Sequence, residues 1–203
     1  GGGANQYSEN LKNQYIRDKH SGIIFCNDAR TGEMYLRILY NNFEHKIFFN
    51  AYKQIKDALL LFDIEEGFYN EAVSHKDPKK SLNLFFFFLK TKQAKLQIAM
   101  HDFFPICPSY TLLNDEGEYC GVPTDIDICT KCIKRNNVDF LNNNVDFESW
   151  RILWDDIFAY CSNIICFSDS TKSILLKAFH KFENKISVVP HIQHVDFSRK
   201  PFI

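Results

Sequence analysis

The spacing of apolar residues along the chain changes repeatedly between a helical and an extended period. Tyr7, Leu11 and Tyr15 form one stripe at helical spacing, whereas residues 96–100 form a short apolar run that is typical of a buried strand. The same pattern predicts strands at residues 23–26, 34–40, 45–51, 68–73, 96–100, 164–167 and 186–189. It predicts helices at residues 5–19, 55–62 and 150–161, after the start signal Asp77-Pro78, and from the cap at Ser168 as far as Phe182.

The alternation of these strands with helices predicts the fold class. Strands separated by helices of this length form a mostly parallel sheet with helices on both faces. We therefore expect an α/β domain with a Rossmann-like, doubly wound sheet. The two extended segments on either side of Asn41-Asn42 predict a β-hairpin in addition.

The strand at residues 96–100 ends in His101-Asp102, and this junction is the first candidate site. Open α/β sheets bind their ligands at the carboxyl ends of the strands. A lone histidine is often a satisfied core or surface residue, so a structural role for His101 stays open beside a catalytic one.

Four cysteines follow this junction in a segment that contains few apolar residues. Cys107, Cys120, Cys129 and Cys132 have the spacing Cys-x12-Cys-x8-Cys-x2-Cys, and the closing Cys-x-x-Cys favours zinc. A metal would supply folding energy that the segment otherwise lacks. The alternatives are an iron–sulfur cluster, a redox pair at 129 and 132, unrelated thiols, or a Cys₃His site that includes His101. We expect a cysteine-rich loop insert that binds a structural zinc ion.

Gly1-Gly2-Gly3 stand before the first predicted helix. Backbone N–H groups in a glycine turn at the start of a helix form a binding site for phosphate. A remnant of an affinity tag explains the three glycines equally well.

Charge and composition narrow the class of protein. The formal net charge of −1 gives no electrostatic footprint for nucleic acid. The chain has neither an apolar run of the roughly 18 residues needed for a transmembrane helix nor a signal peptide. We therefore expect a cytoplasmic protein with reduced cysteines.

Several stretches together resemble the amino-terminal domain of the family 4 retaining glycosyltransferases, which have the two-domain GT-B fold. They are the glycines before the first helix, residues 101–108 (HDFFPICP), residues 165–172 (ICFSDSTK) and residues 186–191 (ISVVPH). The cysteine insert is similar to that of a subgroup that acts in bacterial surface-polysaccharide synthesis. The resemblance covers nearly the whole chain.

This resemblance implies a role for each matching residue. His101 is implied to be catalytic and to stabilise charge at the transferred sugar, while Asp102 and Ser168 are implied to bind a glycan or lipid-linked acceptor. The residues implied to bind the diphosphate of the nucleotide-sugar donor are Gly1, Gly2, Gly3 and Asn5.

The resemblance also implies a domain organisation. Residues 1–190 would form the acceptor-side domain, with the cysteine-rich insert at 103–135, and residues 191–203 would begin the linker to a second Rossmann domain. That second half would carry most of the nucleotide site and a Glu-x7-Glu motif, neither of which is found in these 203 residues. We therefore expect a piece of a larger enzyme that is inactive alone and peripheral to the inner face of a membrane.

Two other functions stay open. One is a nicotinamide- or flavin-dependent oxidoreductase, although the chain lacks the G-x-G-x-x-G motif of that class. The other is a non-catalytic, zinc-stabilised module that binds a glycan or a protein.

Overall fold

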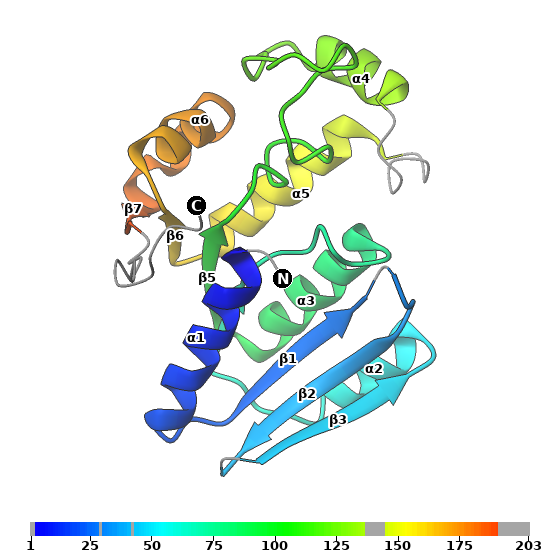
Figure 1. Cartoon of the computed structure of the whole chain (residues 1–203), viewed down its shortest axis with the longest axis vertical. Coiled ribbons are helices and arrows are strands. Elements are labelled where there is room, and N and C mark those ends of the chain that lie inside the picture. Colours follow the sequence, from blue (N-terminus) through cyan, green and yellow to red (C-terminus); the bar gives the residue numbers. More distant parts are fainter. Residues whose placement is uncertain (1–2, 29, 42, 137–144, 191–203) are drawn as a thin grey trace, which may run out of the picture.

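The computed structural model describes residues 3–28, 30–41, 43–136 and 145–190, which contain a parallel and an antiparallel sheet (Figure 1). Gly1, Gly2 and the predicted linker at 191–203 lie outside the described residues. In chain order the elements are α1 Gly3–Arg17, β1 Gly22–Asn27, β2 Met34–Tyr40, β3 Phe43–Phe49, α2 Tyr52–Leu59, β4 Glu66–Tyr69, α3 Pro78–Lys92, β5 Lys95–Met100, α4 Ile126–Arg135, α5 Phe147–Tyr160, β6 Asn163–Cys166, α6 Asp169–Phe179, the 3-10 helix η2 His180–Lys185 and β7 Ile186–Val188.

The parallel sheet has the strand order β4-β5-β6-β7. Its register pairs Tyr69 with Ile98 and Met100 with Cys166, so the carboxyl ends of neighbouring strands lie at one edge. The predicted parallel α/β sheet is therefore confirmed. A doubly wound sheet reverses its strand order at one point. The described strands of the parallel sheet follow chain order from β4 to β7, so no such reversal occurs among them.

Helices cover both faces of this sheet. Leu96, Ile98 and Met100 of β5 point to one face and belong to the larger hydrophobic core, which α3, α5 and α6 also line. On the opposite face Tyr7 of α1 stacks on Phe68 of β4, with their ring centroids 6.0 Å apart. Figure 1 shows α1 crossing in front of β5.

The antiparallel sheet corrects one prediction. The strand at residues 23–26, expected in the parallel sheet, is β1 and pairs with β2 in the separate order β1-β2-β3. The predicted hairpin is confirmed, because β2 and β3 pair from Tyr40 and Phe43 onward. This sheet packs on α2 and α3 through a second, smaller core that includes Leu36 and Ile55.

Helix α3 lies between the two cores. The start signal is confirmed: Pro78 is in the first turn, and the Asp77 side chain accepts a hydrogen bond of 3.0 Å from the backbone N–H of Lys80. Its buried residues in the larger core are Leu82, Phe86 and Leu89, and those in the smaller core are Leu84 and Phe88. A helix with apolar residues on opposite sides fits a position between two sheets.

The cysteine-rich segment at 103–135 contains a helix, α4, although the sequence predicts an irregular loop there. Asp125 caps this helix by accepting a hydrogen bond of 2.9 Å from the backbone N–H of Asp127. Within the described residues, no helix has the length and apolar character needed to cross a lipid bilayer.

Candidate functional site

Three neighbouring strands each deliver a polar or aromatic side chain to the same edge of the parallel sheet. Asn70 follows β4 directly, His101 follows β5 and Phe167 follows β6. The parallel register brings these three positions together. Helix α1 begins at this edge too, because the Asn70 side chain donates a hydrogen bond of 3.1 Å to the backbone carbonyl of Ala4.

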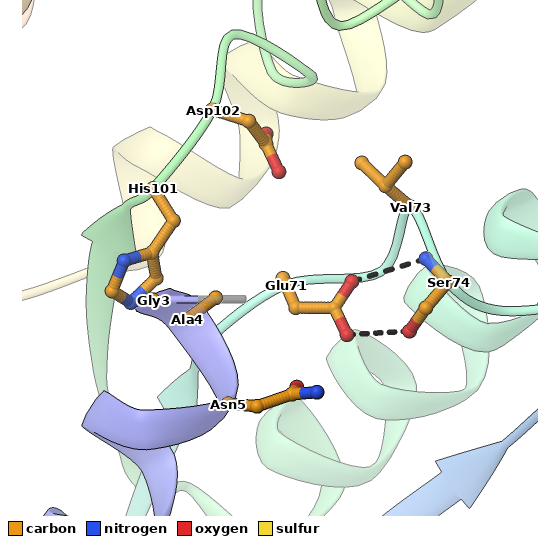
Figure 2. A pocket seen from close by; sticks show the side chains of 8 residues that line it. All are labelled: Gly3, Ala4, Asn5, Glu71, Val73, Ser74, His101 and Asp102. Atoms are coloured by element: carbon orange, nitrogen blue, oxygen red, sulfur yellow. Dashed lines mark hydrogen bonds between the residues drawn. The ribbon is translucent and has the colours of Figure 1, made fainter. Parts of the chain in front are cut away.

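A pocket of about 470 Å³ lies at this edge (Figure 2). Four of the residues predicted for the site, Gly3, Asn5, His101 and Asp102, line this one pocket. The complete lining is Gly3, Ala4, Asn5, Glu71, Val73, Ser74, His101 and Asp102.

Hydrogen bonding fixes the proton position on His101. The Asn70 amide nitrogen faces the carbonyl of Ala4, so its oxygen faces His101, 3.0 Å from Nε2. An amide oxygen only accepts hydrogen bonds, so Nε2 of His101 carries a proton and donates it. The tautomer of His101 is thereby set by a residue at the end of the neighbouring strand.

Aromatic rings hold the imidazole of His101 on two sides. The ring of Phe167 stacks on it with a centroid distance of 4.7 Å, and the ring of Tyr7 meets it edge-on at 5.1 Å. A side chain that follows β6 and one from α1 therefore restrict the ring in addition to the hydrogen bond to Asn70.

Asp102 is a half-buried carboxyl group with a perturbed pKa. Burial raises the pKa of Asp102 to about 6, and the charge of Glu71 adds to this rise, while the backbone N–H of Phe104 opposes it through a hydrogen bond of 2.9 Å. A carboxyl group that titrates near neutral pH can exchange a proton with a ligand.

The amino end of α1 supplies backbone N–H groups and the positive end of a helix dipole to the pocket. Gly3 is exposed, and a Cβ atom at this position would meet no atom within 4 Å. Steric space therefore gives no reason for glycine at position 3.

Ser168 lies near the same edge but does not line the pocket. It follows Phe167, and its hydroxyl accepts a hydrogen bond of 3.1 Å from the backbone N–H of Thr171. Ser168 thus caps α6, as the sequence predicts, and its implied contact with an acceptor stays a prediction.

Sequence reasoning missed Asn70, Glu71 and Ser74 as site residues. The strand predicted at 68–73 is β4 Glu66–Tyr69, so Asn70 and Glu71 already stand beyond its carboxyl end. Both oxygens of Glu71 accept hydrogen bonds from Ser74, at 3.1 Å from the backbone N–H and 2.5 Å from the hydroxyl (Figure 2). Asn70 and Glu71 form a polar pair directly after an apolar run, and this signal would have located both residues.

None of the four cysteines of the insert lines this pocket. All seven cysteines of the chain have free thiols. Across residues 3–28, 30–41, 43–136 and 145–190, no three histidine, cysteine, aspartate or glutamate side chains are already arranged to hold a metal ion. The predicted metal-binding loop therefore stays a prediction.

No known protein family, no curated protein and no solved structure matches this chain.

Proposed function

We propose that this chain is the acceptor-side half of a nucleotide-sugar-dependent glycosyltransferase that acts in surface-polysaccharide synthesis. The observation that carries the proposal is the pocket in which His101, Asp102 and the amino end of α1 meet. These groups come from distant parts of the chain, and each matches a position implied by the resemblance in sequence. A Rossmann-like first domain with a metal-bound insert is part of this proposal.

The reaction moves a sugar from its diphosphate to a hydroxyl group of the acceptor. The bond between the anomeric carbon and the diphosphate oxygen breaks, a bond from the acceptor oxygen to that carbon forms, and the hydroxyl proton leaves with the nucleoside diphosphate. The transition state carries positive charge on the sugar ring and negative charge on the leaving group. Preorganised dipoles aimed at such charges are the largest source of rate enhancement in many enzymes.

The pocket offers a group for each part of this reaction. The N–H groups at Gly3 and Ala4 and the helix dipole of α1 would face the diphosphate. His101, whose Nε2 hydrogen bond to Asn70 fixes its orientation, would stabilise the transferred sugar. Asp102 would bind the acceptor hydroxyl, and its pKa of about 6 allows both protonation states near neutral pH.

The complete gene product that contains this chain provides the test, because a second domain would supply most of the donor site. It is incubated with UDP-glucose, UDP-N-acetylglucosamine, UDP-galactose or GDP-mannose, and the release of UDP or GDP is measured. We expect one donor to be hydrolysed, and we expect His101→Ala to lower that rate by about 100-fold or more. The matched control is His45→Ala, which removes an exposed histidine of β3 and is expected to leave the rate unchanged.

Three results would overturn the proposal. One is a folded gene product that hydrolyses none of the donors, and another is a His101→Ala variant with the full rate. The third is thermal stabilisation by NAD⁺ or NADP⁺ with none by nucleotide sugars, which would favour an oxidoreductase.

A further inference from the structure

The four cysteines at 107, 120, 129 and 132 gather in one region beside α5, although they come from three separate local structures. Cys107 opens a turn in which its carbonyl accepts a hydrogen bond of 2.8 Å from the backbone N–H of Tyr110. Cys120 directly follows the tight turn closed by the bridge between Leu113 and Tyr119. Cys129 and Cys132 are three residues apart on α4, so they lie on the same side of that helix.

Electrostatic and packing contacts show that these thiols are neighbours. The charge of Cys129 would interact with those of the other three thiols, and the charge of Cys107 with those of Cys120 and Cys132. Cys107 and Cys129 also pack against the same small apolar cluster, formed by Ile133 and Phe147. The fold thus brings together the four residues that the sequence pattern singles out.

Arg151 of α5 is a half-buried cation beside these thiols. Its guanidinium lies over the rings of Phe147 and Phe179, 5.1 and 5.2 Å from their centroids. Its Nε atom is buried and has no hydrogen-bond partner among the described residues, and no carboxylate of those residues forms an ion pair with it. A cation that is partly removed from water and has no carboxylate partner is stabilised by an anion placed beside it. As thiolates, Cys129, Cys107 and Cys120 would each act on the charge of Arg151.

We infer that Cys107, Cys120, Cys129 and Cys132 bind one structural Zn²⁺ ion as thiolates, and that Arg151 is the charge partner of this site. Each thiol loses its proton on binding, and four thiolates with Zn²⁺ carry a net charge of about −2. Arg151 does not bind the metal itself but lies next to the ligands and offsets part of this charge. Residues in such positions change the affinity of a site for its metal. Because no three of the thiols are already arranged to hold an ion, zinc binding draws them together and orders the segment between Cys107 and Cys132.

The first experiment measures the metal content of the chain purified without added chelator. Elemental analysis is expected to give about one zinc per chain, as a closed four-sulfur site requires. The double variant Cys129→Ser/Cys132→Ser is expected to lose the zinc. In the matched control, Cys26→Ala removes a thiol of β1, which lies outside this region, and keeps the zinc. A zinc-free protein whose melting temperature does not change on addition of ZnCl₂, or a purified protein with iron and visible absorption, overturns the inference.

The second experiment tests Arg151 through the affinity for zinc, measured by competition with a chromophoric chelator. Arg151→Met keeps an apolar side chain over the rings but removes the charge, and is expected to weaken zinc binding by about 10-fold. Arg151→Lys restores the charge and is expected to recover most of that loss. The control is Arg135→Met, which removes an exposed guanidinium of α4 that pairs with Asp115 at 3.0 Å.

Equal affinities for the Met and Lys variants of Arg151 would refute its role as charge partner. Neither measurement depends on glycosyl transfer, so the zinc site and the proposed transfer activity fail separately.

Discussion

Asp102 connects the chemistry of the pocket to the stability of the fold. Its pKa is raised to about 6 by burial, whereas an aspartate in an unfolded chain has a pKa of about 3.9. The folded state therefore holds this proton more tightly than the unfolded state does. The contribution of Asp102 to stability is complete below pH about 4 and is lost as the pH rises through about 6.

Asp102→Asn is accordingly expected to stabilise the protein at pH 8 and to leave its stability nearly unchanged at pH 4. A shift of two pKa units corresponds to at most about 3 kcal/mol, and partial exposure of the carboxyl group makes the gain smaller. Urea unfolding at the two pH values measures the difference. Asp57→Asn, on an exposed position of α2, is the control, and Glu71→Gln tests the other carboxylate whose charge reaches Asp102. An equal effect of Asp102→Asn at both pH values would contradict the assignment.

At the scale of single residues, the sequence located the pocket but not the groups that support it. His101 and Asp102 were predictable because an apolar run ends abruptly in two polar residues, and this signal is local. Asn70 and Arg151 were not predictable, because their importance depends on what another strand or helix places beside them. The proton position on His101, for example, follows from a contact between Asn70, which follows β4, and α1, and no sequence spacing encodes this contact.

At the scale of elements, the tight packing of β4 against α3 gives a further prediction. Gly67 is buried in β4, and a Cβ atom there would lie 2.8 Å from Cδ1 of Leu89, a fully buried residue of α3. Gly67→Ala therefore forces the strand and the helix apart.

The expected cost of Gly67→Ala is about 1–3 kcal/mol in the free energy of unfolding, as is usual when a packed core is overfilled. Chemical denaturation measures it. Gly22→Ala serves as the control, because a Cβ atom there would lie at an ordinary 3.6 Å from Cδ1 of Leu39 in β2. The interpretation is wrong if both substitutions have the same effect. Smaller residues at position 89, as in Gly67→Ala/Leu89→Val, are expected to recover part of the loss.

Most elements were predictable because each carries its own apolar period, and α3 and α6 also carry a capping residue. The exceptions have physical causes. The strand β1 has the apolar run of a parallel-sheet strand, yet it pairs with the hairpin that follows it, and periodicity does not determine which strand is the partner. Helix α4 was missed because its cysteines suggested a metal loop, although Asp125 supplies a cap. The sequence did not predict that α3 carries apolar residues on opposite sides, which follows from the position of the helix between two cores.

At the scale of the whole molecule, α3 makes the two sheets depend on each other. It contributes Leu82 and Leu89 to the larger core and Leu84 and Phe88 to the smaller one. Loss of either core exposes one side of this helix to water. The pocket is formed by α1 and by segments that follow strands of the parallel sheet. The antiparallel sheet also contacts α1 directly, because Arg37 of β2 forms an ion pair of 2.9 Å with Glu9 of α1.

This arrangement predicts that the two sheets unfold in one cooperative transition. Leu36 of β2 is fully buried in the smaller core, and Leu36→Ala is expected to cost about 2–5 kcal/mol. Both tryptophans of the chain, Trp150 and Trp154, lie in the larger core, so their fluorescence reports on the other sheet. If α3 couples the cores, Leu36→Ala lowers the unfolding midpoint seen by fluorescence as much as that seen by circular dichroism.

The exposed Ile47 of β3 provides a matched control, since Ile47→Ala is expected to leave both midpoints nearly unchanged. A fluorescence midpoint that stays fixed while circular dichroism detects an early partial transition would show instead that the antiparallel sheet unfolds independently of the parallel sheet and its pocket.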